Sequence, residues 1–333
     1  MLPFRRASTL PATLLVAAFL GGAAVPLANG PLREDPFVVR PFQTRSAERW
    51  IGNAICYGPH RDGQRPGGPT PSAAELREDL RLLTGHWNLL RIYGASGFAE
   101  ALLSMIRDDG WDMKVMLGVW IAPADTSANR RELEAAVRLA AAYPEIVAAV
   151  CVGNETQVSW SAHRCALDFL IGYVREARAR TVVPVSVADD FSFWNKPESR
   201  TLAAELDFIT LHAHPMWNGR QLDEALTWLR DQTAAVQALH SGRSVVLGET
   251  GWATSIHAEG EQAALIKGRP GEAEQKQFYR EVRTWASAAW LPVFVFEAFD
   301  ENWKGGAHPD EVEKHWGLFR ADRSPKAAVR PGN

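Results

Sequence analysis

The sequence predicts a single (β/α)8 barrel, and three observations support that prediction. Eight short apolar runs, rich in β-branched residues, follow one another along the 333-residue chain, which is typical of strands buried on both faces of a parallel sheet. Amphipathic stretches with helical spacing separate the runs. Together they cover roughly 275 residues, the size of one such barrel, and no linker-like segment divides them.

The predicted elements can be placed in chain order. The stretch "SAAELREDLRLLTGH" at 72–86 predicts a helix with Ser72 as its N-cap, and "NRRELEAAVRLAAAY" at 129–143 predicts a helix that Pro144 ends. The Pro- and Gly-rich segment 58–71 is short enough for a strand-to-helix loop. The predicted strands are "IGNAICYG" from Ile51, "LLRIYG" from Leu89, "KVMLGVW" from Lys114, "IVAAVCVGNE" from Ile146, "TVVPVSVAD" from Thr181, "LDFITLHAH" from Leu206, "SVVLGETGW" from Ser244 and "LPVFVFEAFD" from Leu291.

The first thirty residues differ in composition from the rest. Arg5 and Arg6 precede an apolar stretch from Leu10 to Leu27 that becomes rich in small residues, which is the pattern of a secretory signal peptide. The alternative is that residues 1–30 stay attached as an N-terminal membrane anchor. In both cases we expect residues 31–333 to form the barrel domain, in the periplasm or outside the cell.

Composition narrows the class of partner. A net charge of -3 supplies no basic surface for nucleic acid, and only an uncleaved N-terminal segment would bring the chain to a membrane. Three cysteines are not a disulfide framework, and Cys56 and Cys151 lie in strand-like runs, so we expect small buried side chains there. The 13 tryptophans, against 5 tyrosines, suit either core packing or flat platforms for sugar rings.

Acidic residues end several of the predicted strands. The fourth run ends in Asn154 and Glu155, the seventh contains Glu249, and the eighth reaches Glu297. A barrel brings the carboxyl ends of its strands to one rim, where active sites lie. Carboxylates at the ends of buried strands are costly unless they are paired or used. Two of them at one rim indicate the carboxylate pair of glycoside hydrolysis, which acts by retention when the carboxyls lie about 5 to 5.5 Å apart.

Five motifs in order resemble one known family. "ICYGP", "LRIYG", "VGNE", "GETGW" and "FDENWK" followed by "EKHWGLF" are similar to glycoside hydrolase family 17, the β-1,3-glucanases and related β-1,3-glucanosyltransferases. The resemblance spans almost all of residues 31–333 and implies that they form the catalytic domain. "GWATS" after Glu249 resembles bacterial and fungal members, and only about 33 residues separate the sixth and seventh runs, too few for the extra subdomain of plant members. This leaves exo-action and glucanosyl transfer open beside endo-hydrolysis.

The resemblance assigns roles residue by residue. Glu155 is implied as the general acid/base and Glu249 as the nucleophile, with Asn154 bound to the 2-hydroxyl of the sugar. The mechanism requires Glu155 to be protonated and Glu249 ionised in the resting enzyme. The implied substrate contacts at the cleft are Tyr57, Tyr93, Glu301, Lys304 and Glu313.

Other residues near strand ends have several interpretations. "HAHP" puts His212 and His214 on one strand face, where they could bind a metal with a third ligand, bind sugar hydroxyls or pack. No H-E-x-x-H motif or cysteine pair supports a metal, so we expect His214 to contact sugar and expect neither metal nor cofactor. The pair Asp189 and Asp190 could face the cleft or begin a helix. Sugar contacts are also expected from Trp217, Trp252 and Glu297, although a buried ion pair is the alternative for Glu297.

These observations predict a retaining glycoside hydrolase acting on β-1,3-glucan, or a β-1,3-glucanosyltransferase using the same site. Two alternatives remain: a glucan-binding barrel without activity, and a retaining enzyme for another β-glycan. The carboxylate pair disfavours the first and the last strand's motif disfavours the second. A nucleotide-cofactor barrel is disfavoured because no Gly-rich phosphate loop follows the last two strands.

Overall fold

The computed structural model describes residues 37–46 and 49–330 of the chain. The signal peptide or anchor expected at residues 1–30 lies outside this described part. Contacts separate Met1–Val38 from a second unit, Val39–Asn333, which holds every element discussed below. No helix in the described ranges has the length and apolarity needed to cross a membrane.

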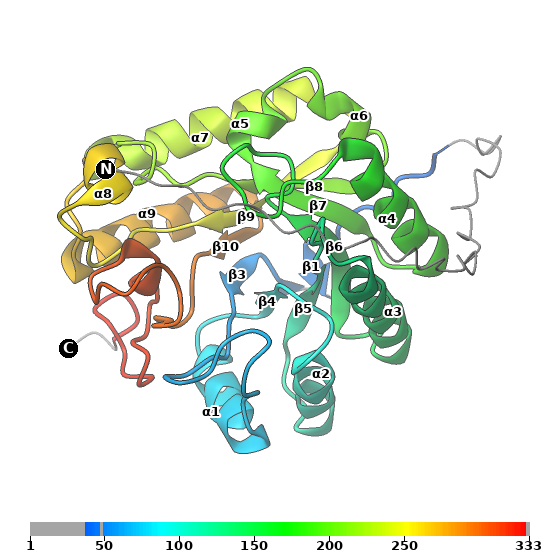
Figure 1. Ribbon diagram of the computed structural model, residues 1–333, viewed down its shortest axis with the longest axis horizontal. Coiled ribbons are helices and arrows are strands. Elements are labelled where there is room, and N and C mark those ends of the chain that lie inside the picture. The colour runs from blue at the N-terminus through cyan, green and yellow to red at the C-terminus, as the bar shows by residue number, and fades with distance from the viewer. Residues whose placement is uncertain (1–36, 47–48, 331–333) are drawn as a thin grey trace, which may run out of the picture. The chain divides into compact units, whose positions relative to one another are not determined.

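The second unit is a (β/α)8 barrel, as the sequence predicted (Figure 1). Eight strands, all parallel to their neighbours, close in the order β10-β3-β4-β5-β6-β7-β8-β9. A short antiparallel pair, β1 (Arg45–Ser46) and β2 (Arg49–Trp50), precedes them. The barrel strands are β3 (Asn53–Cys56), β4 (Leu89–Ile92), β5 (Lys114–Val119), β6 (Val147–Asn154), β7 (Val185–Asp190), β8 (Phe208–His212), β9 (Ser244–Thr250) and β10 (Val293–Val295).

Helices surround the strands in Figure 1. The first of them begins at the expected cap, because the Ser72 hydroxyl accepts from the backbone N–H of Glu75 while the Glu75 carboxylate accepts from that of Ser72. The helices are α1 (Ala73–Leu83), α2 (Ala99–Asp108), α3 (Thr126–Ala142), α4 (Leu167–Arg180), α5 (Phe191–Trp194), α6 (Ser199–Ala203), α7 (Leu222–Leu239), α8 (Gly260–Leu265) and α9 (Glu272–Ala289).

The core has two layers, and this explains why the strands are apolar almost throughout. Alternate strand residues point into the barrel or outward against the helices, so both sets are buried. Cys56 and Cys151 belong to the inner set, as buried free thiols. The inner layer consists of Phe42, Ala54, Cys56, Leu89, Met116, Ala149, Cys151, Ala188, Phe208, Val246 and Phe294.

The eighth strand is not followed by the α-helix that strict alternation would give. After β10, the described residues up to 330 contain only the 3-10 turn η1 (Val312–Lys314) and irregular chain. This last segment is tied to α1 by Arg323, whose Nε and Nη2 donate to the buried carboxylate of Asp79 at 2.9 and 3.0 Å. Tyr57 also donates to Asp79, at 3.0 Å, and Arg61 pairs with it. A buried ion network therefore holds the C-terminal segment where a helix would otherwise cover the barrel.

We expect Arg323→Ala to lower the free energy of unfolding by about 3 kcal/mol, because removing one partner leaves a buried charge poorly compensated. The loss should fall at the lower end of the usual range since Arg61 still pairs with Asp79. The matched control is Arg330→Ala, whose exposed pairing with Glu272 at 3.8 Å should contribute less than about 1 kcal/mol. Urea unfolding measures both. Equal losses in the two variants would show that the Asp79 network does not hold the segment.

Candidate active site

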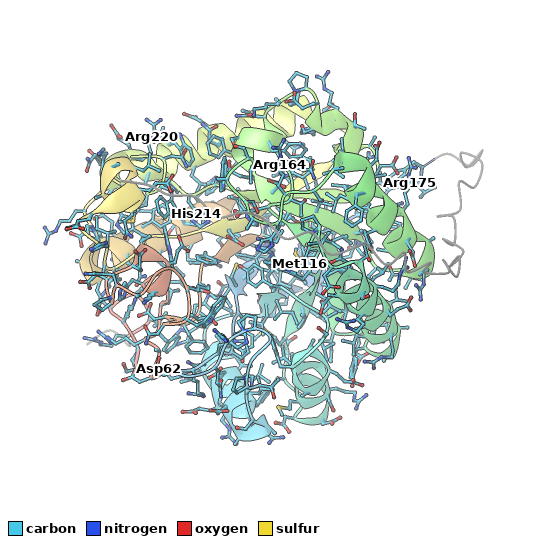
Figure 2. All side chains as sticks on the ribbon, in the orientation of Figure 1. Asp62, Met116, Arg164, Arg175, His214 and Arg220 are labelled. Carbon is cyan, nitrogen blue, oxygen red and sulfur yellow. The ribbon has the colours of Figure 1, made fainter. Side chains whose placement is uncertain are left out.

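The site lies at the carboxyl ends of the strands, where Figure 2 shows His214 near the middle of the ring while Arg175 and Arg220 lie at its margin. Glu155 follows β6 directly, and its own backbone is left-handed with a φ of 50°. Gly153, just before it, has a φ of 81°, a conformation that favours glycine. These two residues turn the chain at the end of β6, and the Glu155 N–H donates to the carbonyl of Ala188 on β7 at 2.9 Å. Backbone strain of this kind concentrates at functional sites.

Glu155 and Glu249 come together across His212. His212 Nδ1 lies 3.1 Å from Glu155 Oε1, and its Nε2 lies 3.4 Å from Glu249 Oε1. One oxygen of each carboxylate and one ring nitrogen of His212 all lie within 4.8 Å of one another. Two carboxylates and an imidazole at this spacing are also a set of ligand atoms that could bind a divalent cation.

Glu249 is buried among hydrogen-bond donors. Arg91 Nη1 lies 2.6 Å from its Oε1, the Tyr93 hydroxyl donates to the same oxygen at 2.9 Å, and His214 Nε2 lies 3.4 Å from Oε2. Burial alone would raise the pKa of Glu249, but His212, Arg91 and His214 outweigh it and hold that pKa well below the usual range. Glu249 is therefore a carboxylate at neutral pH.

Arg91 connects three strands beneath the site. It lies on β4 and is buried, and its Nη2 donates to the Asn154 side-chain oxygen at 2.7 Å while Nη1 reaches both Glu249 and the Gly248 carbonyl on β9. Its guanidinium also lies over the Tyr93 ring, 4.6 Å from the centroid. With its oxygen accepting from Arg91, Asn154 keeps N–H groups to donate to a ligand.

A second cluster of charged side chains lies after β10. Lys304 Nζ is 2.6 Å from Glu297 Oε2 and 2.8 Å from Glu301 Oε2, and His60 Nδ1 is 3.3 Å from Glu301 Oε1. Burial and the charge of Glu301 raise the pKa of Glu297 well above its usual range despite Lys304. Burial also acts on Glu301, but Lys304 and His60 lower its pKa to about 2. One lysine thus faces two buried carboxyl groups, and the buried Oε1 of Glu297 has no hydrogen-bond partner among the described residues.

The remaining polar group connects the loop after β8 with the last segment. Trp217, half-buried, donates from Nε1 to Glu313 Oε1 at 3.2 Å. Burial raises the pKa of Glu313. The ring of His214 packs edge-on against Phe296 and Trp316, with centroids 5.6 and 5.2 Å away. Burial would lower the pKa of His214, but its hydrogen bond to Glu249 and the charge of that group raise it.

Ten of the twelve sequence-predicted site residues meet in these groups. They are Tyr93, Asn154, Glu155, His214, Trp217, Glu249, Glu297, Glu301, Lys304 and Glu313.

The structure does not bring Tyr57 and Trp252 to the cleft, so their expected sugar contacts are withdrawn. Tyr57 is fully buried on the outer side of the barrel wall and donates to Asp79. Trp252 is 1 % exposed, packs on Phe278 of α9 and donates to the Arg269 carbonyl at 2.9 Å. In both cases the residue follows a strand end, but its side chain takes the outward direction of the alternation.

Arg91, His212 and His60 were not among the predicted site residues. An arginine inside the apolar run "LLRIYG" was the available signal for Arg91, because a buried guanidinium needs an anionic partner. His212 shares its strand face with His214, so the pattern did not favour one over the other. The Asp189–Asp190 pair is partly explained by the helix-start interpretation, because the Asp190 carboxylate caps α5 by accepting from the Ser192 N–H.

The sequence matches a known family of glycoside hydrolase domains. The model of the BtgE/BtgC glycoside hydrolase domain matches residues 54–317. The chain is 28% identical over 281 residues to a protein named glucan 1,3-beta-glucosidase from Arthroderma benhamiae, covering 79% of this chain and 86% of that protein.

The structure also superposes on solved structures of enzymes named for action on β-1,3-glucan. An endo-laminarinase from Formosa Hel1_33_131 superposes with a TM-score of 0.74 at 26% identity, covering 84% of this chain and 87% of the other. A glycoside hydrolase family 17 beta-1,3-glucanosyltransferase from Rhizomucor miehei superposes with a TM-score of 0.69, covering 83% and 96%. At 23% identity, that second likeness concerns the fold.

We expect Arg91→Met to destabilise the protein in a pH-dependent way. At pH 7 the loss should be about 3 kcal/mol or more, because Glu249 stays buried without its guanidinium partner. The folded-state pKa of Glu249 lies below its unfolded value of 4.5, so its stabilisation is present above about pH 4.5 and is lost as pH falls toward the folded-state pKa. The difference between wild type and variant should therefore narrow between pH 5 and pH 2.

Urea unfolding at several pH values measures this difference. The control is Arg107→Met, whose pairing with Asp108 is largely exposed and should contribute little at any pH. A loss at Arg91 that does not change with pH would mean that this side chain acts through packing and not through its charge.

Proposed function

Because the chain belongs to the BtgE/BtgC glycoside hydrolase domain family, we propose that it is a retaining enzyme of glycoside hydrolase family 17 acting on β-1,3-glucan. The observation that carries the proposal is the close approach of Glu155 and Glu249, with one oxygen of each within 4.8 Å. Retaining glycosidases place their carboxyls about 5 to 5.5 Å apart, whereas inverting enzymes need about 6.5 to 9.5 Å to admit a water.

Glu249 has the environment that the nucleophile of a double displacement needs. Glu249, ionised and held by Arg91 and Tyr93, attacks the anomeric carbon and forms a glycosyl ester. Glu155 gives its proton to the glycosidic oxygen as the C–O bond breaks, and the leaving sugar departs as an alcohol. In the second step Glu155 takes a proton from the incoming water or sugar hydroxyl, whose oxygen displaces Glu249 from the anomeric carbon. This sequence needs neither a metal nor an organic cofactor.

Neighbouring groups bind the sugar in this scheme. Asn154, oriented by Arg91, donates to the 2-hydroxyl, a contact that strengthens toward the oxocarbenium-like transition state. The buried Oε1 of Glu297 has no hydrogen-bond partner among the described residues, so it can accept a hydrogen bond from a sugar hydroxyl. Trp217 and Lys304 supply further donors and a partly exposed aromatic face.

β-1,3-Glucanosyl transfer is the second candidate, and the connection after β8 favours considering it. Only α7 (Leu222–Leu239) lies between β8 and β9, so no additional subdomain extends the cleft on that side of the described chain. A short cleft holds fewer glucose units, which is compatible with exo-action or transfer. We further propose that the protein works in the periplasm or outside the cell, on the signal-like composition of residues 1–30.

We expect the two carboxylates to give azide products of opposite configuration. With an activated aryl β-laminaribioside, Glu249→Ala should lower turnover by about 10³-fold or more, and azide should then form the α-glycosyl azide by direct displacement. Glu155→Ala should still form the glycosyl ester, because the aryl leaving group needs no proton, and azide should then give the β-glycosyl azide. NMR identifies the anomers. The control is Glu145→Ala, exposed before β6 at the other end of the barrel, which should keep wild-type turnover.

Two results would contradict the assignment. Azide products of the same anomer from both variants would exclude the stated division of roles. The absence of any azide product from folded variants would exclude a covalent intermediate at Glu249.

We expect product lengths to separate hydrolysis from transfer. Incubation with a reducing-end-labelled β-1,3-gluco-oligosaccharide, followed over time by mass spectrometry, should give only shorter products from a hydrolase. Early products longer than the substrate should identify a transferase. Glu155→Gln is the control and should give neither within the same time. Binding without any products in the wild type would favour the inactive-barrel alternative.

A further inference from the structure

A cavity of about 310 Å³ opens between the loops that follow β6 and β7. Its volume is at the lower end of that of small-molecule sites. The loop after β6 is the one that begins with Glu155, and it closes on itself through the Cys165 N–H, which donates to the Thr156 carbonyl at 3.0 Å. Figure 2 labels Arg164 of this loop between His214 and the margin of the barrel.

The cavity combines an aromatic surface with hydrogen-bonding groups. Trp160 is a large apolar side chain, yet it is 62 % exposed. Val158 and Phe193, which are buried, also line the cavity. Gln157 and Ser192 add polar atoms to the lining. An exposed indole beside amide and hydroxyl groups is the surface that stacks on a sugar ring and binds its hydroxyls.

The charge of the lining is positive. Arg164 and Lys196 both line the cavity, both are exposed, and neither makes an ion pair within the described ranges. Glu198 is the one carboxylate in the lining. Of the two acids at the end of β7, Asp189 is fully buried, does not line the cavity and accepts from the Gln157 N–H at 2.8 Å, and burial raises its pKa to about 8. The Asp190 carboxylate caps α5 by accepting from the Ser192 N–H.

The place of the cavity identifies the part of the substrate that would reach it. In the proposed function, Glu155 faces the oxygen that leaves and later the oxygen that enters, so the leaving and acceptor sugars lie on its side of the site. Gln157 and Val158 of the lining follow Glu155 by two and three residues, whereas Glu249 lies on β9, two strands beyond β7 in the barrel.

We propose that this cavity is a subsite for an acceptor or leaving saccharide that carries an anionic group, either a phosphate ester or a uronic carboxylate. The inference rests on the proposed function. Trp160 stacks on the sugar ring, and Arg164 and Lys196 bind the anion from the two loops. In transfer, an acceptor hydroxyl oxygen bonds to the anomeric carbon, its proton goes to Glu155, and the ester bond to Glu249 breaks.

The test is a competition among acceptors. The full enzyme receives an unsubstituted β-1,3-gluco-oligosaccharide as donor, with glucose, glucose 6-phosphate and glucuronic acid at equal concentration, and mass spectrometry counts the transfer products. We expect at least one charged acceptor to exceed glucose by about fivefold, and the preference to fall with added salt. In Arg164→Gln/Lys196→Gln the ratio of charged-acceptor to glucose products should approach one, because the cationic side chains are gone. A ratio measured within one variant is independent of any general loss of activity.

Two further variants sharpen the test. Lys276→Gln/Arg280→Gln makes the same charge change on the exposed face of α9, a helix that does not line the cavity, and should keep the wild-type ratio. Glu198→Gln should raise the ratio because it removes the negative charge from the lining. No preference in the wild type, or a preference that survives in Arg164→Gln/Lys196→Gln, would overturn the proposal.

A hydrolase without transfer is tested by binding. Tryptophan fluorescence is titrated with glucose, glucose 6-phosphate and glucuronic acid, and tighter binding of at least one charged sugar, lost in Arg164→Gln/Lys196→Gln, supports the subsite. Equal binding of all three sugars overturns it. If the enzyme cleaves the donor but does not prefer charged sugars, only the subsite proposal is contradicted. If it acts on no β-1,3-glucan, the proposed function is contradicted as well.

Discussion

The buried contact between Arg91 and Glu249 is the constraint on which the rest of the site depends. A carboxylate deep in an apolar barrel is unstable unless a fixed positive group compensates it, and a guanidinium presents its donors in a rigid plane. Because Arg91 also binds Asn154 and the Gly248 carbonyl, the same group sets the relative positions of β4, β6 and β9. The same arrangement therefore compensates the buried charge and fixes the geometry of the candidate site.

Two buried carboxyl groups at the same rim have pKa values that shift in opposite directions. Glu249 has Arg91, Tyr93 and His214 around it, and it is ionised. Glu297 shares a single lysine with Glu301, and burial raises its pKa. Burial acts on both carboxyl groups, and the pKa values diverge because Glu249 has more cationic neighbours than Glu297.

Pattern in the sequence was enough for the barrel and for the two principal carboxylates. Continuous apolar runs mark strands that are covered on both sides, and Glu155 and Glu249 stand where such runs end. The direction of a side chain near a strand end depends on where the strand stops, and a shift of one residue exchanges inside and outside. That is why Tyr93 reaches Glu249 while Tyr57 and Trp252 turn away. The role of Arg91 was not predicted, because its partners Asn154 and Glu249 lie 63 and 158 residues away in the sequence.

The ion network at Asp79 has a consequence for the order of events during synthesis. The barrel closes where β10 pairs with β3. Beside this pairing, Arg323 binds Asp79, which lies 244 residues earlier in the chain. A growing chain that has completed β9 still presents β3 as an open sheet edge, with unpaired backbone groups. The barrel can close only after β10 has been made, about 240 residues after β3, so its closure depends on contacts distant in sequence.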